Sequence, residues 1–430
     1  MWWLDLVWET IANRILISFL GKLELLIAEI KVINLTEMAI LLTIPLHIFA
    51  REGKMKSVLL SIILASSVSI LSLSAGNAEE IKQQKPEIVA KLPNSVGNIA
   101  FTPDNQLIFS HHPFYNPDVR VAKLTSETTF EPFPNAEWNT PRPGTDHYLD
   151  NVLGLRSDEE GVVWIIDMGF RTGITPKLVG WNTRTNKLER IYYMPRPTTR
   201  DGSQPQDIVI DKKHRKFYIA DEDIGPGGDA SQSAIIVIDM DTGEGRRVLE
   251  GDHSTVPENV GINVDGKDLT VEGADKKPFV LKVGCDGITM DTEAEWLYFA
   301  PLSGRSLYRI RTSDINDETL SAKDLSSKVE RYSDKPNNGG LSIDYGGNLY
   351  LTAVESKSVG VITPDRKYHT IATDPNLVWP DGITYSPDGH MYVSASQISA
   401  AAMFHDGKAQ NSTPYMIFRF KPLEPGYISR

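Results

Sequence analysis

The sequence predicts an all-β protein with the architecture of a six-bladed β-propeller, and three observations lead to this fold. A pattern of apolar strand, turn bearing Asp or Gly, and second apolar strand occurs six times along the chain. Repeats of roughly 40 to 50 residues are typical of radial folds, because one repeat cannot bury its own apolar face. Helical periodicity is nearly absent. The six copies begin at Gly97, Asn151, Gln206, Asp286, Gly339 and Asp381.

Each copy is expected to form an antiparallel hairpin, because apolar residues alternate with period two on both sides of a short turn. The copy QDIVIDKKHRKFYIAD, residues 206–221, is an example. A second Asp in the hairpin turn recurs in the copies and is expected to cap the turn. The longest gap, residues 221–285, contains the segment INVDGKDLTVEG, whose Asp265-Gly266 pair suits a tight turn of its own.

Two further strands are predicted outside the repeats, EIVAKL at residues 87–92 and YMIFRF at residues 415–420. A propeller must hide the edges of its sheets, and pairing strands from both termini in one blade closes the ring. We therefore expect EIVAKL to form the outermost strand of the last blade.

Composition excludes some classes of function. The formal net charge of −12 argues against a nucleic-acid partner, because phosphate binding needs clustered Lys and Arg. The single cysteine, Cys285, rules out an internal disulfide. A propeller of about 330 residues buries enough apolar surface without one. We expect a monomer that binds a small molecule.

The N-terminal part of the chain does not follow the repeat pattern. Residues 55–78 have the basic start, apolar centre and small final residues of a secretory signal peptide, with cleavage expected after Ala78. This predicts a secreted or periplasmic propeller domain over residues 79–430. The alternative is an uncleaved segment that anchors the chain in a membrane. Residues 1–54 are then either an over-extended reading of the gene that begins at Met55 or a membrane-associated segment.

The repeats also predict where a site should lie. Residues just before the innermost strands face the mouth of a central channel, and the repeat alignment places Asn151, Gln206, Asp286 and Asp381 there. Their oxygens are ligands that hard divalent cations such as Ca²⁺ prefer, so Asn151, Asp286 and Asp381 are candidate metal ligands. Without a metal, Asp286 and Asp381 are candidate catalytic proton acceptors. The competing interpretation is ordinary turn chemistry for each Asp-Gly pair.

Three other side chains are candidates for the same mouth. His147 precedes Asn151 closely and is a candidate proton shuttle. Trp379 and Phe170 are candidates for stacking on a ring-shaped ligand, with packing between blades as the alternative. The adjacent pair His111 and His112 is expected to be structural, because neighbouring residues on a strand face opposite ways.

Several segments resemble the major royal jelly protein and yellow family. They are LDNVLGLRSDEEGVVWIIDMGF, CDGITMDTEAEWLYFAPLSGRSLYRI and DPNLVWPDGITYSPDGHMYVSASQI, and the resemblance extends over most of residues 86–420. It implies a secreted six-bladed propeller, in a family whose insect members are linked to dopachrome conversion or bind biogenic amines. A more distant similarity to gluconolactonase-like propellers implies one divalent cation on the central axis.

Two functions therefore follow from the sequence. The first is an enzyme that acts on a small cyclic or aromatic metabolite at the channel mouth, as a lactone hydrolase or a dopachrome-type tautomerase. The second is a secreted protein that binds a small molecule such as an amine without converting it.

Overall fold

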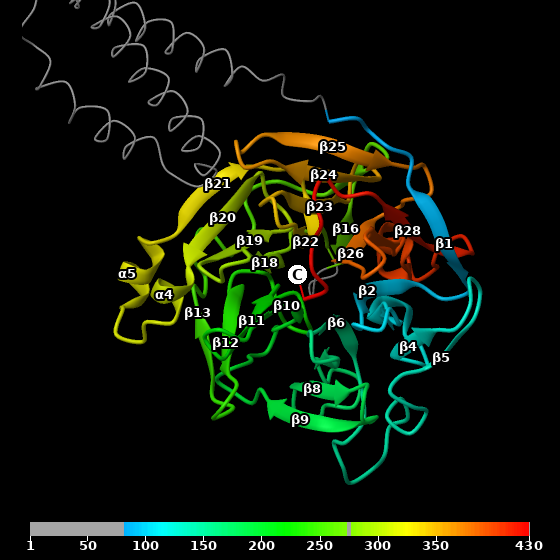
Figure 1. Ribbon diagram of the computed structural model, residues 1–430, viewed down its shortest axis with the longest axis horizontal. Coiled ribbons are helices and arrows are strands. Elements are labelled where there is room, and N and C mark those ends of the chain that lie inside the picture. Colours follow the sequence, from blue (N-terminus) through cyan, green and yellow to red (C-terminus); the bar gives the residue numbers. More distant parts are fainter. Residues whose placement is uncertain (1–80, 273–276, 430) are drawn as a thin grey trace, which may run out of the picture. The chain divides into compact units, whose positions relative to one another are not determined.

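The computed structural model describes residues 81–272 and 277–429, and these residues form a six-bladed β-propeller. Figure 1 shows the sheets arranged radially around a central axis. Residues 81–430 make up one compact unit. The signal-peptide prediction for residues 55–78 and both interpretations of residues 1–54 lie outside the described residues. In the described part of the chain, none of the helices has the length and hydropathy needed to cross a membrane.

Each blade is a four-stranded antiparallel sheet, and in blades 1 to 5 the strands follow one another from the axis outward in chain order. Blade 1 contains β2 (Val96–Phe101), β3 (Leu107–His111), β4 (Val121–Leu124) and β5 (Phe130–Pro132). Blade 2 contains β6 (Val152–Ser157), β7 (Val162–Asp167), β8 (Lys177–Asn182) and β9 (Lys187–Tyr193). Blade 3 contains β10 (Pro205–Asp211), β11 (Lys216–Asp221), β12 (Ala234–Asp239) and β13 (Gly245–Val248).

Blades 4 and 5 follow the same plan. Blade 4 contains β18 (Cys285–Met290), β19 (Trp296–Pro301), β20 (Ser306–Arg311) and β21 (Glu330–Asp334). Blade 5 contains β22 (Asn338–Ile343), β23 (Leu349–Ala353), β24 (Ser358–Ile362) and β25 (Tyr368–Thr373). Two short helices, α4 (Thr312–Ile315) and α5 (Ala322–Ser326), connect β20 to β21.

Blade 6 closes the ring with strands from both ends of the propeller. It contains β26 (Pro380–Tyr385), β27 (Met391–Ala395) and β28 (Tyr415–Phe420), followed on the outside by β1 (Glu87–Leu92). Strand β1 pairs antiparallel with β28, Leu92 opposite Tyr415. The prediction that EIVAKL forms the outermost strand of the last blade is confirmed.

The gap between blades 3 and 4 contains two small hairpins. The first joins β14 (Asn263–Val264) to β15 (Lys267–Asp268) through the predicted Asp265-Gly266 turn. The second joins β16 (Thr270–Glu272) to β17 (Pro278–Val280). Three short 3₁₀ helices lie in other loops: η2 (Pro113–Tyr115), η3 (Ile398–Ala400) and η4 (Ala402–Phe404).

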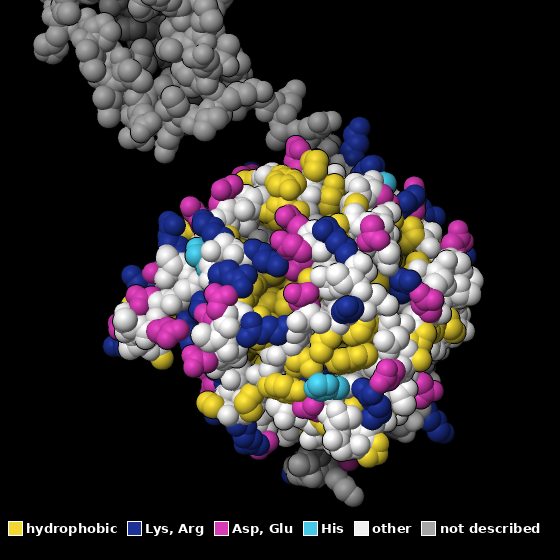
Figure 2. Space-filling view, turned by 60° about the horizontal axis from the view of Figure 1, so that its bottom comes forward, with side chains coloured by type: hydrophobic (Ala, Val, Ile, Leu, Met, Phe, Trp, Pro, Cys, Tyr) yellow, Lys and Arg dark blue, Asp and Glu magenta, His cyan; other side chains and the backbone are white. Residues whose placement is uncertain are grey.

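Apolar side chains fill the space between neighbouring blades. Between blades 3 and 4, for example, Val209 and Tyr218 pack in one buried cluster with Ile288 and Phe299. On the outside, the face shown in Figure 2 has basic and acidic side chains interspersed around a hollow that contains hydrophobic ones. The predicted turn caps are present too: Asp158 accepts hydrogen bonds from the backbone N–H groups of Glu160 and Val162.

The innermost strand pair of every blade has a register shift near the start of the inner strand. Such bulges re-aim side chains and are common beside functional sites. The inner strands also approach one another closely there. A Cβ atom on Gly154 would lie 1.4 Å from the backbone oxygen of Gln206, so blade 2 requires glycine at this point.

Candidate functional site

A small cavity lies where the inner strands of blades 2, 3, 4 and 6 begin, and its volume is about 30 Å³. This is enough room for one or two water molecules. Polar side chains in the lining come from strand ends and apolar ones mainly from loops. The lining residues are His112, Phe114, Leu153, Gln204, Gln206, Glu222, Ile224, Leu281, Val283, Asp286, Leu302, Trp379, Asp381, Ile398 and Phe404.

Strand pairing identifies which residues are equivalent at this mouth. In each blade one residue directly follows the first paired residue of the inner strand. The six equivalent residues are Gly97, Leu153, Gln206, Asp286, Gly339 and Asp381. The predicted alignment is correct for five blades and wrong for blade 2. There, Asn151 lies two residues before the equivalent Leu153, because Val152 is the residue that pairs with Asp167.

A second set of equivalent residues follows the end of the second strand in each blade. Its members are His112, Met168, Glu222, Leu302, Val354 and Ser396. Of these, His112, Glu222 and Leu302 line the cavity. Blades 1, 2, 3, 4 and 6 therefore each contribute one or two of these residues to the lining, and its ionisable members come from blades 1, 3, 4 and 6.

The carboxyl groups of Glu222, Asp286 and Asp381 form the polar end of the cavity. Gln204 Nε2 donates to Glu222 Oε2 over 2.6 Å, and Gln206 Nε2 donates to Asp286 Oδ1. The Asp286 and Glu222 side chains also interact with each other, and this interaction raises the pKa of Asp286. Two neighbouring carboxyl groups repel when both are charged, so a single proton between them stabilises the pair. Each of the two has a carboxamide beside it.

Burial raises the pKa of all three acids. Glu222 has a pKa of about 8 and Asp381 a pKa of about 7, both mainly because the charged form loses its hydration. The pKa of Asp286 is raised well above its ordinary value, first by burial and then by the charges of Glu222, Asp381 and Asp207. At neutral pH this cluster both holds and releases protons.

A buried ion pair lies beneath the cluster. Asp207, the residue after Gln206, accepts a hydrogen bond from Arg156 Nη2 over 3.0 Å, and both side chains are almost fully buried. Asp207 also accepts from Asn98 Nδ2 over 3.4 Å. Asn98 and Asp207 belong to blades 1 and 3, so this contact links the two blades on either side of blade 2.

The rest of the cavity wall is apolar. Trp379, Leu281, Val283 and Ile398 belong to a buried cluster against which Phe114 and Phe404 pack from η2 and η4. Burial lowers the pKa of His112 to about 3, so this ring is neutral. Its Nδ1 accepts the backbone N–H of Phe114, which leaves Nε2 as the protonated nitrogen. Carboxyl groups thus face an apolar and aromatic wall.

The structure does not bring all the predicted side chains to this cavity. Asn151 is outside the lining, and its backbone N–H donates to Asp167. His147 is also outside it: the side chain is 54% exposed and the ring stacks on Trp138. The ring of Phe170 lies against Gly225, one layer behind the cavity wall. The predicted residues that do line the cavity are Gln206, Asp286, Trp379 and Asp381.

Sequence reasoning missed Glu222, Gln204 and the position of His112. Glu222 and His112 each follow a second strand, so an alignment of the second strands as well as the first would have found both. Gln204 lies before β10 and has no counterpart in the repeat pattern. Cys285, the residue before Asp286, is buried, and burial raises the pKa of its thiol.

The oxygen atoms at the cavity are suitable ligands for a hard cation, but they are not arranged around a common point. The Gln206 carbonyl oxygen is buried and has no hydrogen-bond partner among the described residues, and carboxylate oxygens adjoin it. These are oxygen ligands of the kind Ca²⁺ prefers. The Glu222 and Asp286 carboxyl groups are nevertheless already bonded to side-chain amides. Within residues 81–272 and 277–429, no three His, Cys, Asp or Glu side chains are arranged to hold a metal ion.

Comparison with known families gives one match. The model of the family described as Major royal jelly protein matches residues 151–421, well over half of the chain. The matched region includes Glu222, Asp286 and Asp381. A search of curated protein sequences gave no match.

Solved structures with a similar fold were also found. One is a protein provisionally assigned as a gluconolactonase, with 12% identity and a TM-score of 0.49 over 80% of this chain and 94% of that chain. A gluconolactonase from Xanthomonas campestris has 11% identity and a TM-score of 0.46, covering 79% and 95%. The calcium-binding protein regucalcin from Agrobacterium tumefaciens has 12% identity and a TM-score of 0.45, covering 80% and 97%.

Proposed function

Because this chain belongs to the major royal jelly protein family and has a proton-sharing carboxyl cluster at its channel mouth, we propose that it is an acid–base catalyst. Its substrate is a small cyclic or aromatic metabolite. The observation that carries the proposal is the set of three buried acids, Glu222, Asp286 and Asp381, at the wall of an apolar cavity.

The pKa values give the cluster its chemistry. A general acid or base works best when its pKa lies near the operating pH, and Glu222 and Asp381 have pKa values of about 8 and 7. A carboxylate of the cluster takes a proton from a C–H or O–H group of the substrate. A protonated carboxyl of the cluster returns a proton to another substrate atom. The net reaction is a tautomerisation, in which no other reactant is consumed.

The apolar wall determines the kind of substrate. Trp379, Phe114 and Phe404 offer ring faces on which a flat molecule stacks. The cavity of about 30 Å³ is smaller than such a ring, so the wall must move when the substrate enters. Phe114 and Phe404 lie on short 3₁₀ helices and are half-buried, which makes them the side chains that move.

The same oxygens would hold a divalent cation if the carboxyl groups turned away from each other. Asp286, Asp381, Glu222 and the Gln206 carbonyl are the residues that would bind it. Such a cation would polarise a carbonyl group of the substrate, which would favour hydrolysis of a lactone. Binding of the cation and binding of the shared proton are then mutually exclusive, so calcium would be held better at high pH.

Full-length protein assayed with a dopachrome-type substrate and with a panel of lactones tests these proposals. Each assay is run with added Ca²⁺ and with a chelator. Turnover is expected to fall about 100-fold or more in Glu222→Gln, Asp286→Asn and Asp381→Asn, the scale of general acid–base catalysis. Asp365→Asn, at an exposed acid on blade 5, is the matched control and is expected to keep full activity. Absence of turnover on every substrate, or full activity in the three variants, contradicts the proposal.

A second function, the capture of a small amine without turnover, is favoured by one observation. The cavity lining contains three acids and no Lys or Arg side chain. A protonated amine would be attracted by these acids and by the ring faces around them. Calorimetry with phenylethylamines and indoleamines separates the two functions. Tight binding that Asp381→Asn removes, together with absence of turnover, supports the binder.

Export is the remaining part of the proposal, and it rests on the signal-peptide pattern of residues 55–78. The mature chain would begin at Glu79. N-terminal sequencing of the protein recovered outside the cytoplasm tests this, and a chain that still begins at Met1 contradicts it.

A further inference from the structure

Blades 2 and 3 each contain a buried Asp at the end of the second strand that holds the backbone beside the inner strand. In blade 2, Asp167 accepts the backbone N–H groups of Asp150, Asn151 and Gly169. Its Oδ2 lies 2.7 Å from Lys177 Nζ, and both side chains are fully buried. We call this arrangement the blade 2 anchor.

The blade 3 anchor has the same plan with different partners. Asp221 Oδ1 accepts the backbone N–H of Gln204 over 2.6 Å and that of Asp223 over 3.3 Å. Its Oδ2 accepts from Ser203 Oγ over 2.7 Å and from Arg247 Nη1 over 2.5 Å. Asp221 therefore ties the chain before β10 to the chain after β11.

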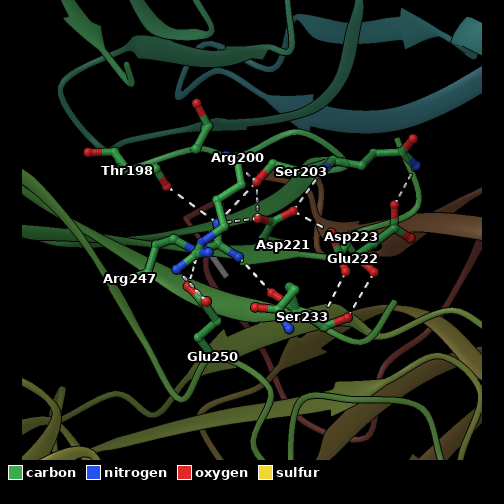
Figure 3. A network of polar contacts seen from close by, with 12 residues as sticks. Thr198, Arg200, Ser203, Asp221, Glu222, Asp223, Ser233, Arg247 and Glu250 are labelled. Atoms are coloured by element: carbon green, nitrogen blue, oxygen red, sulfur yellow. Dashed lines mark hydrogen bonds and ion pairs between the residues drawn. The ribbon is translucent and has the colours of Figure 1, made fainter. Parts of the chain in front are cut away.

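Arg247 reaches this anchor from the outer strand β13 and is almost fully buried. Figure 3 shows Asp221 between Ser203 and Arg247, with Glu222 beside it. The remaining guanidinium nitrogens are also used: Nε donates to Glu250 Oε2 and Nη2 to the Gln232 carbonyl. A planar guanidinium with five fixed donors can make all these contacts at once, whereas an ammonium cannot.

The two anchors differ in what they support. The blade 2 anchor is followed by Met168, which does not line the cavity. The blade 3 anchor is flanked by Gln204 and Glu222, which do line it and bond to each other over 2.6 Å. Ser233 Oγ also donates to the Glu222 carbonyl. The backbone on both sides of the Gln204–Glu222 pair is thus held by Asp221.

We propose that Arg247 and Asp221, which lie outside the cavity, are positioning residues that hold Glu222 and Gln204 against the carboxyl cluster. Their effect on catalysis rests on the proposed function, whereas their effect on the protonation of Glu222 does not. Positioning groups one layer behind a reactive group commonly change its activity 10- to 100-fold.

The direction of the expected change separates positioning from simple electrostatics. Glu222 is faced by Asp286 from β18, by Asp381 from β26 and by Asp221 from its own strand. If Glu222 stays in place, removing the Arg247 cation adds to the negative surroundings and raises the Glu222 pKa further. If Glu222 loses its position and reaches water, its pKa falls toward the ordinary value of a glutamate.

The test is a carboxyl ¹³C NMR titration of full-length protein labelled at Glu, with Glu222→Gln used to assign the Glu222 signal. We expect the Glu222 pKa to fall from about 8 to below 6 in Arg247→Met and in Asp221→Asn. Lys177→Met removes the equivalent cation of the blade 2 anchor and is the matched control, expected to leave the Glu222 pKa unchanged. An unchanged or higher pKa in Arg247→Met, or an equal fall in Lys177→Met, overturns the proposal.

The conservative exchanges keep the test decisive if a methionine variant does not fold. Arg247→Lys retains the charge but not the five donors, so the Glu222 pKa is expected to fall, whereas Lys177→Arg is expected to leave it unchanged. A Glu222 pKa that Arg247→Lys does not move overturns the proposal. Failure of the proposed function appears differently, as wild-type protein without turnover whose Glu222 pKa still responds to Arg247.

Discussion

Blades 2 and 3 have the same backbone plan, yet only blade 3 brings polar side chains to the cavity. Both end their second strand with a buried Asp that is paired with a buried cation, Lys177 in one and Arg247 in the other. At the mouth, however, blade 2 presents Leu153 and Met168 where blade 3 presents Gln206 and Glu222. Some buried polar residues hold the backbone of a blade in place, whereas others line the cavity, where they can react with a ligand. Blades 2 and 3 share residues of the first kind, and only blade 3 has residues of the second.

The largest expected effect is on stability, and it concerns the blade 2 anchor. Lys177→Met leaves the Asp167 carboxylate buried without its cation. Removing one partner of a buried pair typically costs about 3–5 kcal/mol. We therefore expect the free energy of unfolding to fall by about this amount in urea denaturation. Arg247→Met should cost a similar amount, because Asp221 keeps Ser203 Oγ and two backbone N–H groups while Asp167 keeps three backbone N–H groups. A loss below about 1 kcal/mol in Lys177→Met would show that the two anchors are not comparable.

The next largest effect is on the pH dependence of stability. It is expected when Glu222 of blade 3 is replaced by methionine, the residue that blade 2 has at the equivalent position, Met168. In Glu222→Met the cavity loses an acid whose pKa is about 8 in the folded protein and near 4.5 when unfolded. Between these values the folded state holds a proton that the unfolded state has released. The wild type therefore loses stability as the pH rises from about 5 to 8. The variant should lose less, so its stability relative to that of the wild type should rise by about 2–4 kcal/mol between pH 5 and pH 8.

Urea denaturation at pH 5 and pH 8 measures this difference. The matched control is Asp365→Asn on blade 5, where the side chain is more than half exposed. It should leave the pH dependence of stability as it is in the wild type. Equal slopes in wild type and Glu222→Met would mean that Glu222 is not held protonated by its surroundings.

A third effect is on stability, and it concerns the close approach of blades 2 and 3 at Gly154. In Gly154→Ala the new methyl group would meet the backbone oxygen of Gln206, which cannot move without moving β10. Overpacking of this kind typically costs about 1–3 kcal/mol, and Gln206 should shift away from Asp286. Gly173→Ala is a useful control, since a Cβ there has no neighbour within 4 Å, although its positive φ adds some strain of its own. A Gly154→Ala variant as stable as the wild type contradicts this explanation.

The blades, their closure and part of the site could be predicted from the sequence. Alternation of apolar residues is a local signal, so the hairpins and the strand at residues 87–92 are recognisable without a structure. Gln206, Asp286 and Asp381 were found because the alignment of the six repeats places each of them at the start of an apolar run. Trp379 was found because it precedes this run in blade 6.

The rest of the site depends on register and on contacts between distant residues. Asn151 was placed two residues out because blade 2 has the apolar Leu153 at the equivalent position, and the polar residue just before the apolar run was aligned in its place. Glu222 was missed because its importance comes from Asp286, which is more than sixty residues away in the chain. Arg247 lies on an outer strand, where charged residues normally face water, and its burial depends on Asp221.

The smallest expected effect concerns Asp381, the acid of blade 6. Ser396 follows the second strand of that blade as Glu222 follows that of blade 3. Its single Oγ–H is shared between Asp381 Oδ2, at 3.2 Å, and the Val96 carbonyl. The bond to Asp381 favours the carboxylate and so lowers its pKa, which burial otherwise raises. In Ser396→Ala the Asp381 pKa should therefore rise above about 7, and stability should fall by about 1 kcal/mol.

A carboxyl ¹³C NMR titration of Asp-labelled protein measures the change in the Asp381 pKa. Ser394→Ala in the same blade is the control, because Ser394 bonds to the Gly97 carbonyl and to the Gly382 N–H. If the Asp381 pKa falls in Ser396→Ala, Ser396 does not stabilise the Asp381 carboxylate. The effect of a residue after the second strand on the pKa of a nearby acid would then be limited to Glu222 and Asp286.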